Sequence, residues 1–242
     1  MREVRLTKRI EFAAAHRYWR ADWDAAKNQA VFASSAREHG HNYMLEVTVI
    51  GPVDPKTGMV VNLYDLKRVL KELLEEFDHK HLNQDTPYFK HGLPTGEHVA
   101  GVLWQLLSRR QREVGRLERI RLFDDENGCV DVTAPDMADG GAVPATAFAM
   151  RRYPLSLAAA ELQVTVHGPL DPERGQVIDP QAFDQAVQCK VLSSLRGLGE
   201  AGGVNERLAC DLWDRLVTAL PTGLLRQIRL LQSPDCRLDY VG

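Results

Sequence analysis

The sequence predicts an α+β protein made of two copies of one unit, each with the order strand, strand, helix, helix, strand, strand. Three observations support this prediction. Residues 41–51 alternate apolar and polar side chains, the pattern of a half-buried strand. Residues 64–77 carry apolar side chains at helical spacing, with Lys and Glu on the other face. Finally, short stretches of the first half recur in order in the second half, which indicates a duplicated fold.

The bulk composition is that of an ordinary globular protein and argues against several classes. The chain has 242 residues, 44% of them hydrophobic and 26% charged, with a formal net charge of −3. We therefore expect no nucleic-acid or membrane partner recruited by bulk charge. No apolar run is as long as a membrane span, which needs about 18 residues. The four cysteines have no CxxC spacing, so we expect free thiols and a cytoplasmic location.

Two predicted strands separated by a loop open the first half. The first strand covers residues 4–12 and leads through small residues to His16. Residues 18–37 lack clear periodicity, so we expect a loop with at most one helical turn. The second strand covers residues 41–51 and is followed by a turn rich in Pro, Asp and Gly. Residues 59–63 are expected to form a short extended piece.

Two helices and two further strands complete the first half. The helix over residues 64–77 stops just before an Asp-His pair. Thr95 is expected to cap a second helix over residues 96–111, which has its own apolar stripe. Strands over residues 117–123 and 129–133 follow, joined by a turn rich in Asp, Asn and Gly.

The internal repeat extends along most of the unit. Residues 46–55 recur at residues 163–172, and Gly58 matches Gly175. Further matches follow in the same order: Glu97, Ala100 and Trp104 with Glu206, Ala209 and Trp213, and residues 120–122 with residues 228–230. So many matches in one order predict that the second half has the same fold as the first.

The two copies differ at the residues that carry chemistry. The second copy has one histidine, His167, no H-x-H motif and no counterpart of residues 18–37. We therefore predict a zinc-binding domain over residues 1–134, a linker over residues 134–141, and a second domain over residues 142–242. The second domain is predicted to be a degenerate copy that lacks the metal site.

His39-Gly40-His41 is the strongest short chemical motif. On a strand, residues two apart point to the same face, so His39 and His41 would aim both rings at one point. Two histidines so aligned make two-thirds of a three-histidine zinc site whose fourth position stays open. The motif alone also fits a polar strand start, because patterns this short are common by accident.

A more specific signal comes from five stretches of the first half: Phe12-Ala13-Ala14-Ala15-His16-Arg17, His39-Gly40-His41-Asn42-Tyr43, Gly58-Met59-Val60-Val61-Asn62-Leu63, Phe77-Asp78-His79-Lys80-His81-Leu82-Asn83 and Pro94-Thr95-Gly96-Glu97. With these stretches in order, residues 4–133 resemble the 6-pyruvoyltetrahydropterin synthase family, which includes the 6-carboxytetrahydropterin synthases of queuosine biosynthesis. The second half resembles the fold of that family but not its site.

The resemblance implies the tunnelling fold (T-fold), in which each unit is an antiparallel four-stranded sheet with two helices on one face. Such units join edge to edge into a closed β-barrel, which removes exposed strand edges. We therefore expect a homo-oligomer with sites between subunits. The resemblance also implies Zn²⁺ held by His16, His39 and His41, and a lyase whose small-molecule pterin substrate is 7,8-dihydroneopterin triphosphate.

The resemblance assigns acid–base roles, with one departure. Asp78 and His79 match the family's Asp-His pair, in which the carboxylate orients the imidazole; a histidine favoured by the helix C-terminus is the alternative. Ser35 stands where the family has its cysteine base, or Ser34 does if the alignment has a gap. A serine hydroxyl is far less acidic than a thiol, whose pKa is about 8.5. Glu38 is a candidate substitute base.

The pterin pocket shows a second departure. Asp124 stands where the family has the glutamate that holds the guanidine-like edge of the pterin, so the charge is kept with one methylene less reach. Thr95 and Glu97 close the pterin pocket or simply start the helix. Four cations either bind the triphosphate or are solvated surface charge: Arg17, Arg20, Lys27 and Arg37. These departures leave a second hypothesis, a non-catalytic homologue that binds zinc and a pterin.

Overall fold

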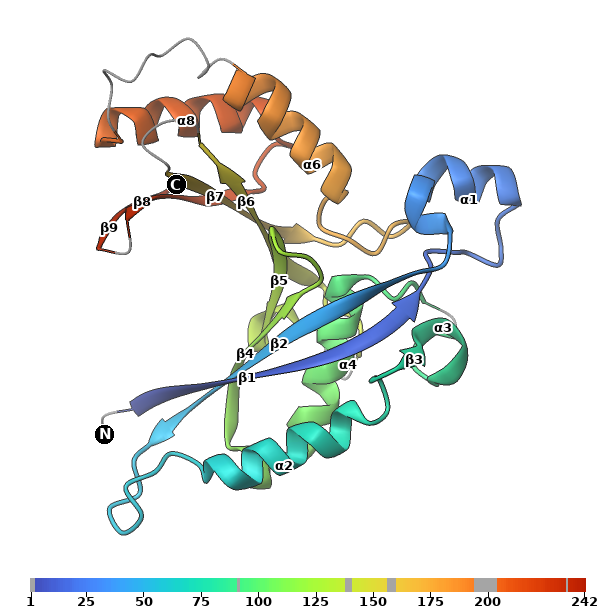
Figure 1. Ribbon diagram of the computed structural model, residues 1–242, viewed down its shortest axis with the longest axis vertical. Coiled ribbons are helices and arrows are strands. Elements are labelled where there is room, and N and C mark those ends of the chain that lie inside the picture. Colours follow the sequence, from blue (N-terminus) through green and yellow to red (C-terminus); the bar gives the residue numbers. More distant parts are fainter. Residues whose placement is uncertain (1–2, 91, 138–140, 156–159, 194–203, 234) are drawn as a thin grey trace. The chain divides into compact units, whose positions relative to one another are not determined.

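The computed structural model describes residues 3–90, 92–137, 141–155, 160–193, 204–233 and 235–242 (Figure 1). The chain folds into two compact units. The first comprises Met1–Ala147 and Leu170–Gln176, and the second comprises Phe148–Pro169 and Val177–Gly242. The sequence-based boundaries did not anticipate that the first unit includes Leu170–Gln176. Of the expected linker, residues 134–136 form a short 3₁₀ helix and residues 138–140 lie outside the described residues.

The sheet of the first unit contains four antiparallel strands and one short parallel edge strand. Its order is β3 (Lys80–His81), β1 (Glu3–His16), β2 (His39–Pro52), β4 (Arg116–Phe123) and β5 (Gly128–Thr133). β1 and β2 pair along their whole length, and β3 runs parallel to β1. This arrangement confirms the predicted antiparallel four-stranded sheet. It adds β3, whose two residues are too few for a periodic pattern to reveal a strand.

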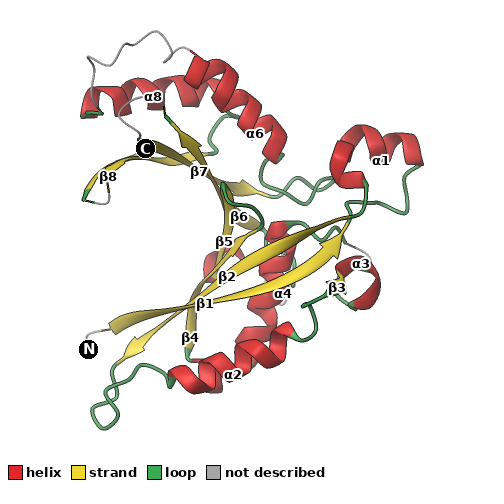
Figure 2. Ribbon diagram, in the orientation of Figure 1, coloured by secondary structure: helices red, strands yellow, loops and turns green. Residues whose placement is uncertain are grey.

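Two helices, α2 (Leu63–Leu74) and α4 (Gly96–Arg109), cover one face of this sheet (Figure 2). Two single-turn helices, α3 (Leu82–Asp85) and α5 (Gln111–Val114), lie beside them in the chain. The helices and strands bury the apolar residues that the periodicity selected, among them Leu45, Val47, Val49, Leu66, Val69, Leu70, Val99, Leu103 and Leu107. Burial of these side chains is the main stabilising term for the unit.

The structure corrects the predicted ends of several elements. β1 does not stop at residue 12 but continues to His16, because Ala13, Ala14 and Ala15 pair with β2. Residues 59–62 form no strand; they follow an exposed turn in which Gly58 has a φ of 72°. α2 begins at Leu63 because the Asn62 side chain accepts a hydrogen bond from the Tyr64 N–H at 2.9 Å.

Residues 18–37 contain more structure than the expected loop. They form α1 (Ala25–Phe32) and the 3₁₀ turn η1 (Ala33–Ala36). The segment is organised by Asn28, which is fully buried. Its amide accepts from the Arg20 N–H at 2.8 Å and donates to three backbone carbonyls, those of Arg20, Trp23 and Asp24. A buried polar side chain therefore holds this segment, and apolar periodicity does not detect such a residue.

The second unit repeats the order of the first. Its strands are β6 (Thr146–Pro154, which starts in the first unit), β7 (Glu161–Pro169), β8 (Leu225–Ser233) and β9 (Cys236–Val241), and its helices include α6 (Pro180–Val187), the π-helical turn η3 (Gln188–Leu192) and α8 (Glu206–Ala219). The strand pairing shifts between Thr165 and Val166, as it does between Thr48 and Val49 in the first copy. These positions match in the repeat, so the copies share a β-bulge as well as an element order.

Among the described residues, no helix is both long and apolar enough to cross a bilayer.

Substitutions in α2 test the assignment of its buried face. Leu70 is fully buried and Leu63 is 48% exposed in the same helix. We expect Leu70→Ala to lower the free energy of unfolding by about 2–5 kcal/mol, because it removes transfer energy and leaves a cavity. Leu63→Ala is the control and should cost less than about 1 kcal/mol. Urea unfolding followed by circular dichroism measures both; equal losses would contradict the assigned face.

Candidate metal centre and adjoining cavity

The register of β1 and β2 brings three histidines together. His16 lies opposite His39, and the next position on the same face pairs Ala14 with His41. Directly opposed residues of an antiparallel pair share a face, and residues two apart on a strand do so too. The ring centroid of His16 lies 4.4 Å from that of His39 and 5.1 Å from that of His41. One ring nitrogen from each histidine lies within 4.8 Å of the other two.

Each histidine uses its Nδ1 atom to hold its ring in place. The Nδ1–H of His16 donates to the Pro94 carbonyl at 2.8 Å, that of His39 to the Arg37 carbonyl at 2.8 Å, and that of His41 to the Asp124 carbonyl at 2.7 Å. A carbonyl oxygen only accepts, so each Nδ1 carries the proton. Each Nε2 is then left with a lone pair, the arrangement that orients metal-binding histidines in proteins.

His16 is the buried member of this cluster. Its side chain is 1% exposed, and its Nε2 is buried without a hydrogen-bond partner among the described residues. Burial, followed by the neighbouring His39 and His41 rings, lowers the pKa of His16 to about 3. The ring is therefore neutral at pH 7 and presents an unsatisfied acceptor. A buried nitrogen of this kind needs a partner, and a metal ion that prefers imidazole ligands fits the donor set.

The candidate substrate-binding residues converge on the same end of the sheet. Asp124 directly follows β4, and its carbonyl is the acceptor for His41. A Cβ built on Gly96 would lie 3.8 Å from Asp124 Oδ2, so the first turn of α4 adjoins this carboxylate. Glu97 is in that turn and is 3% exposed. Asp124 therefore adjoins both His41 and the turn of α4 that Thr95 caps and that contains Glu97.

Thr95 has two structural contacts. Its Oγ1 accepts from the His98 N–H at 3.2 Å, which confirms it as the cap of α4. The same hydroxyl donates to the Gly175 carbonyl at 2.8 Å. Thr95 is fully buried. The helix-start interpretation accounts for the first contact, and the second joins the start of α4 to the turn that contains Gly175.

Ser35 lies in η1, beside the cluster. Its carbonyl accepts from the Tyr18 N–H at 2.8 Å. The Tyr18 ring lies 5.2 Å from the His16 ring and 6.1 Å from the His39 ring, centroid to centroid. Glu38, the alternative base, is exposed, with its Oε1 3.7 Å from Nε2 of His81. Both candidate bases therefore belong to the segment that leads into His39.

Asp78 and His79 form the expected carboxylate–imidazole pair. Asp78 Oδ2 lies 3.0 Å from His79 Nδ1, and Asp78 Oδ1 accepts from the Ala13 N–H at 2.8 Å. The Ala13 hydrogen bond, followed by the His79 contact, lowers the pKa of Asp78, which is therefore ionised at neutral pH. The His79 N–H also donates to the Ala13 carbonyl at 2.6 Å, and this contact holds His79 at a φ of 57°.

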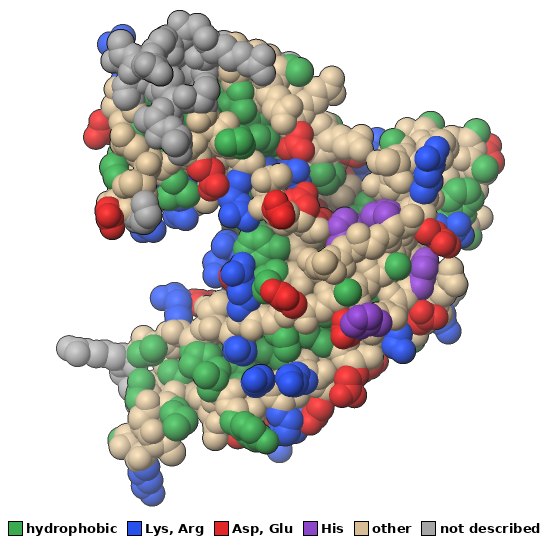
Figure 3. All heavy atoms as spheres, viewed as in Figure 1, with side chains coloured by type: hydrophobic (Ala, Val, Ile, Leu, Met, Phe, Trp, Pro, Cys, Tyr) green, Lys and Arg blue, Asp and Glu red, His purple; other side chains and the backbone are tan. Residues whose placement is uncertain are grey.

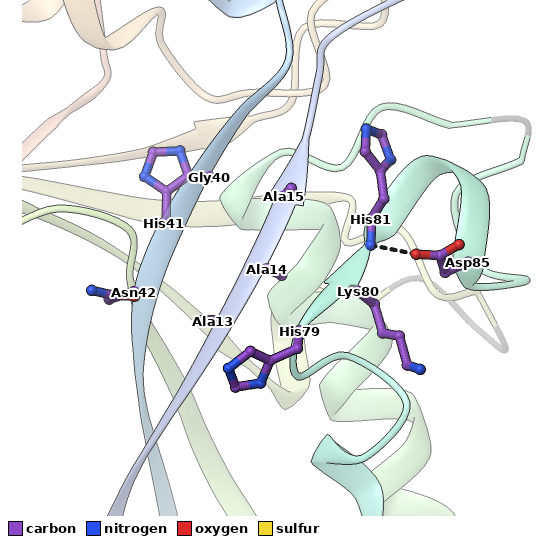
Figure 4. A pocket seen from close by; sticks show the side chains of 10 residues that line it. All are labelled: Ala13, Ala14, Ala15, Gly40, His41, Asn42, His79, Lys80, His81 and Asp85. Carbon is purple, nitrogen blue, oxygen red and sulfur yellow. Dashed lines mark hydrogen bonds between the residues drawn. The ribbon is translucent and has the colours of Figure 1, made fainter.

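An open cavity of about 560 Å³ adjoins this pair (Figure 4). It is lined by Ala13, Ala14, Ala15, Gly40, His41, Asn42, His79, Lys80, His81 and Asp85. The rings of His79 and His81 point away from each other (Figure 4). Among the described residues, the cluster's ring contacts include Tyr18 and Tyr43 but not His79. The His79 side chain is 82% exposed, and Figure 3 shows histidine side chains at the surface of the first unit.

Comparison with known proteins identifies the first half. Residues 5–135 match the family described as 6-pyruvoyl tetrahydropterin synthase. The chain belongs to the 6-pyruvoyl tetrahydropterin synthase family. It is 38% identical to 6-pyruvoyl tetrahydrobiopterin synthase of Pongo abelii over 131 residues, which are 53% of this chain and 90% of that protein. It is 28% identical to 6-carboxy-5,6,7,8-tetrahydropterin synthase of Aquifex aeolicus over 141 residues, 48% of this chain and 86% of that protein.

A solved structure agrees with the family assignment. The 6-pyruvoyl tetrahydropterin synthase of Caenorhabditis elegans matches with a TM-score of 0.53 and 29% sequence identity. That match covers 55% of this chain and 97% of the C. elegans chain. The T-fold predicted for the first half is therefore confirmed.

Two backbone groups that shape the site of this family member were not predicted. The carbonyls of Pro94 and Asp124 carry no signal in the side-chain sequence, although they fix two of the histidine rings.

Two cations considered for the triphosphate have other contacts: the Arg20 guanidinium lies 4.8 Å and the Lys27 Nζ 3.7 Å from the Trp23 ring centroid. Arg20 also pairs with Asp22 at 3.1 Å.

The lowered pKa of His16 predicts how the stability of the metal-free protein varies with pH. An unfolded histidine takes up a proton near pH 6.5, whereas folded His16 does so only near pH 3. Between these values the unfolded state binds more protons, so stability falls as the pH falls, by up to about 1.4 kcal/mol per pH unit from this group. We expect His16→Gln to flatten the slope between pH 6.5 and 4.5. Urea unfolding with a chelator measures it; parallel slopes would contradict the assignment.

Proposed function

We propose that this protein is a zinc-dependent lyase of tetrahydropterin biosynthesis that acts on 7,8-dihydroneopterin triphosphate in the cytoplasm. The reaction is of the 6-pyruvoyl or the 6-carboxy type; the latter serves queuosine biosynthesis, and relatives of both kinds match the first half. The observation that carries the proposal is the convergence of one ring nitrogen from each of three histidines, together with the buried His16 Nε2, which has no hydrogen-bond partner among the described residues. Three converging imidazole nitrogens can bind a metal ion, whereas packing of a protein core does not require them.

Zinc is the metal that we assign to His16, His39 and His41. Three neutral imidazoles are a common catalytic zinc donor set, and they leave one position for a substrate oxygen. When bound, the ion would supply Lewis-acid polarisation to the hydroxyl groups of the substrate side chain. The surrounding residues supply the remaining steps.

The pterin ring is assigned to Asp124 and the first turn of α4. The Asp124 carboxylate would accept two hydrogen bonds from the guanidine-like edge of the pterin, and charge-assisted pairs of this kind are strong and directional. Glu97 would contribute to the same recognition from the buried side. The proximity of Gly96 to Asp124 supports this assignment, because it places the first turn of α4 beside the carboxylate.

Asp78 and His79 are assigned to proton transfer. The Asp78 carboxylate holds the Nδ1–H of His79, which leaves the exposed Nε2 to accept or donate a proton. Because His79 faces the adjoining cavity and does not contact the cluster's rings, we propose that the pair serves the site of a neighbouring subunit. The protein would then be a homo-oligomer with sites between subunits, as the closed barrels of this fold imply.

The role of the base is assigned to Ser35, with Glu38 as its alternative. A serine hydroxyl requires a neighbouring base to become nucleophilic or basic, whereas a carboxylate does not. If neither group removes the proton, the protein binds zinc and a pterin without turnover. The absence of the family's cysteine motivates that second function.

Metal content tests the zinc assignment. We expect one zinc ion per chain in the wild type. His39→Ala should weaken zinc binding by more than the about 10–100-fold that loss of a supporting contact costs, because it removes a ligand. The control is His167→Ala, since His167 stacks on Phe148 at 4.1 Å in the second unit. Competition with a chromogenic chelator measures both, and wild-type affinity in the His39 variant would contradict the site.

Turnover of 7,8-dihydroneopterin triphosphate by the zinc-loaded protein tests the reaction, with products identified by mass. We expect release of triphosphate by the wild type, and faster release by Ser35→Cys because a thiol ionises more readily. Loss of a general base typically costs about 10²–10⁴-fold in rate. A loss of this size in Glu38→Gln, with Ser35→Ala unaffected, would move the role to Glu38. Tight pterin binding without turnover in every variant would support the binding protein.

A further inference from the structure

A turn of the second copy has the same geometry as its counterpart in the first. In the first copy, the Gly58 N–H donates to the Asp54 carbonyl at 2.8 Å, and Asp54 Oδ1 accepts from two backbone N–H groups at 2.7 and 2.9 Å. In the second copy, the Gly175 N–H donates to the Asp171 carbonyl at 2.7 Å, and Asp171 Oδ1 accepts from two N–H groups at 2.8 Å. The two glycines have φ values of 72° and 67°.

The two turns differ in their surroundings. Residues 52–59 of the first turn are all exposed, and a Cβ built on Gly58 would meet no atom within 4 Å. The second turn lies within Leu170–Gln176, which belongs to the first unit. A Cβ built on Gly175 would lie 3.5 Å from Thr95 Cγ2, and Gln176 is 6% exposed. The same local structure is therefore free in one copy and docked in the other.

One set of contacts joins the docked turn to the α4 end of the candidate site. The Gly175 carbonyl accepts from Thr95 Oγ1 at 2.8 Å. The residue before Thr95 is Pro94, whose carbonyl holds the Nδ1–H of His16. The turn is thus one residue away from the support of the buried histidine.

A second set joins the turn to the segment over residues 18–37, where the loop after β7 reaches α1 (Figure 1). Arg174 donates to the Val31 carbonyl at 3.0 Å, and Arg20 donates to the Pro172 carbonyl at 3.2 Å. The Glu173 carboxylate lies 3.3 Å from Lys27 Nζ. This segment carries Tyr18, whose ring contacts the histidines, and continues into η1 and Ser35.

We propose that the turn of the second copy is a positioning element for the site of the first: Glu173 and Arg174 hold the segment over residues 18–37 against the three-histidine cluster. The second half then contributes to the site although it lacks the metal-binding histidines. This inference rests on the proposed function only for what the site binds. The bracing of the segment is a property of the chain itself.

The two turns supply a matched pair of variants. Glu173→Lys with Arg174→Thr gives the docked turn the side chains of the free one. Lys56→Glu with Thr57→Arg is the reciprocal control at the exposed turn. Both variants keep the Asp and Gly that build the turn, so both should fold with the wild-type unfolding midpoint. Hydrogen exchange of residues 18–37, followed by mass spectrometry, is the first readout.

We expect exchange in residues 18–37 to rise by about tenfold in the docked-turn variant, because a charged hydrogen bond and an ion pair that oppose opening are lost. The control should match the wild type. Unchanged exchange in the docked-turn variant overturns the proposal, as does an equal rise throughout the first unit with a lower unfolding midpoint. Neither result depends on catalysis, so failure of the proposed function is seen separately as absence of pterin binding and turnover.

Steady-state kinetics with 7,8-dihydroneopterin triphosphate is the second readout. A segment that is held in place less of the time lowers the population competent to bind, so KM should rise severalfold while kcat stays within about twofold. A faster-exchanging segment with unchanged KM would show that the brace does not serve the site, and would overturn that part of the proposal.

Discussion

The pairing of β1 with β2 is the constraint on which the site depends. Residue by residue, this ladder places His16 opposite His39 and sets His41 one step further along the same face. A slip of one residue would turn either set of side chains to the other face of the sheet, and the three rings would no longer meet. The register is held by apolar side chains at the other end of the ladder, where Leu45, Val47 and Val49 are fully buried. Core packing therefore specifies the geometry of a polar centre.

How much of the fold the sequence predicts depends on what each element buries. α2 and α4 bury continuous apolar stripes, so their periodicity locates them to within a few residues. α1 buries only Asn28 and Phe32 and is stabilised by hydrogen bonds of a single amide. No apolar pattern marks such a helix, and its segment was predicted to be a loop. β1 was predicted too short because its last pairs involve alanines. Alanine has weak strand propensity, and these residues are extended only because they pair with β2.

The candidate site likewise has features that the sequence predicts and features that only the fold shows. Strand alternation alone brings His39 and His41 together, because both lie on one element. His16 joins them through the pairing of β1 with β2, and the sequence alone does not show which strands pair. The resemblance to the family was what predicted His16 as the third ligand. The carbonyls that orient the rings of His16 and His41 come from loops before α4 and after β4. Every backbone unit has a carbonyl, so only the fold shows which ones serve the centre.

The duplicated turn shows which parts of a repeat are constrained by backbone conformation and which are free to change. Asp54 and Asp171 each accept hydrogen bonds from the two equivalent N–H groups of their own turn. Gly58 and Gly175 both lie in the left-handed region that other residues adopt at a cost. The two middle positions of the turn require no particular side chain. They hold Lys-Thr in the first copy and Glu-Arg in the second. The Glu-Arg pair has complementary partners in Lys27 and the Val31 carbonyl. The same backbone turn therefore accepts different side chains at its two middle positions, and only the Glu-Arg pair contacts the segment over residues 18–37.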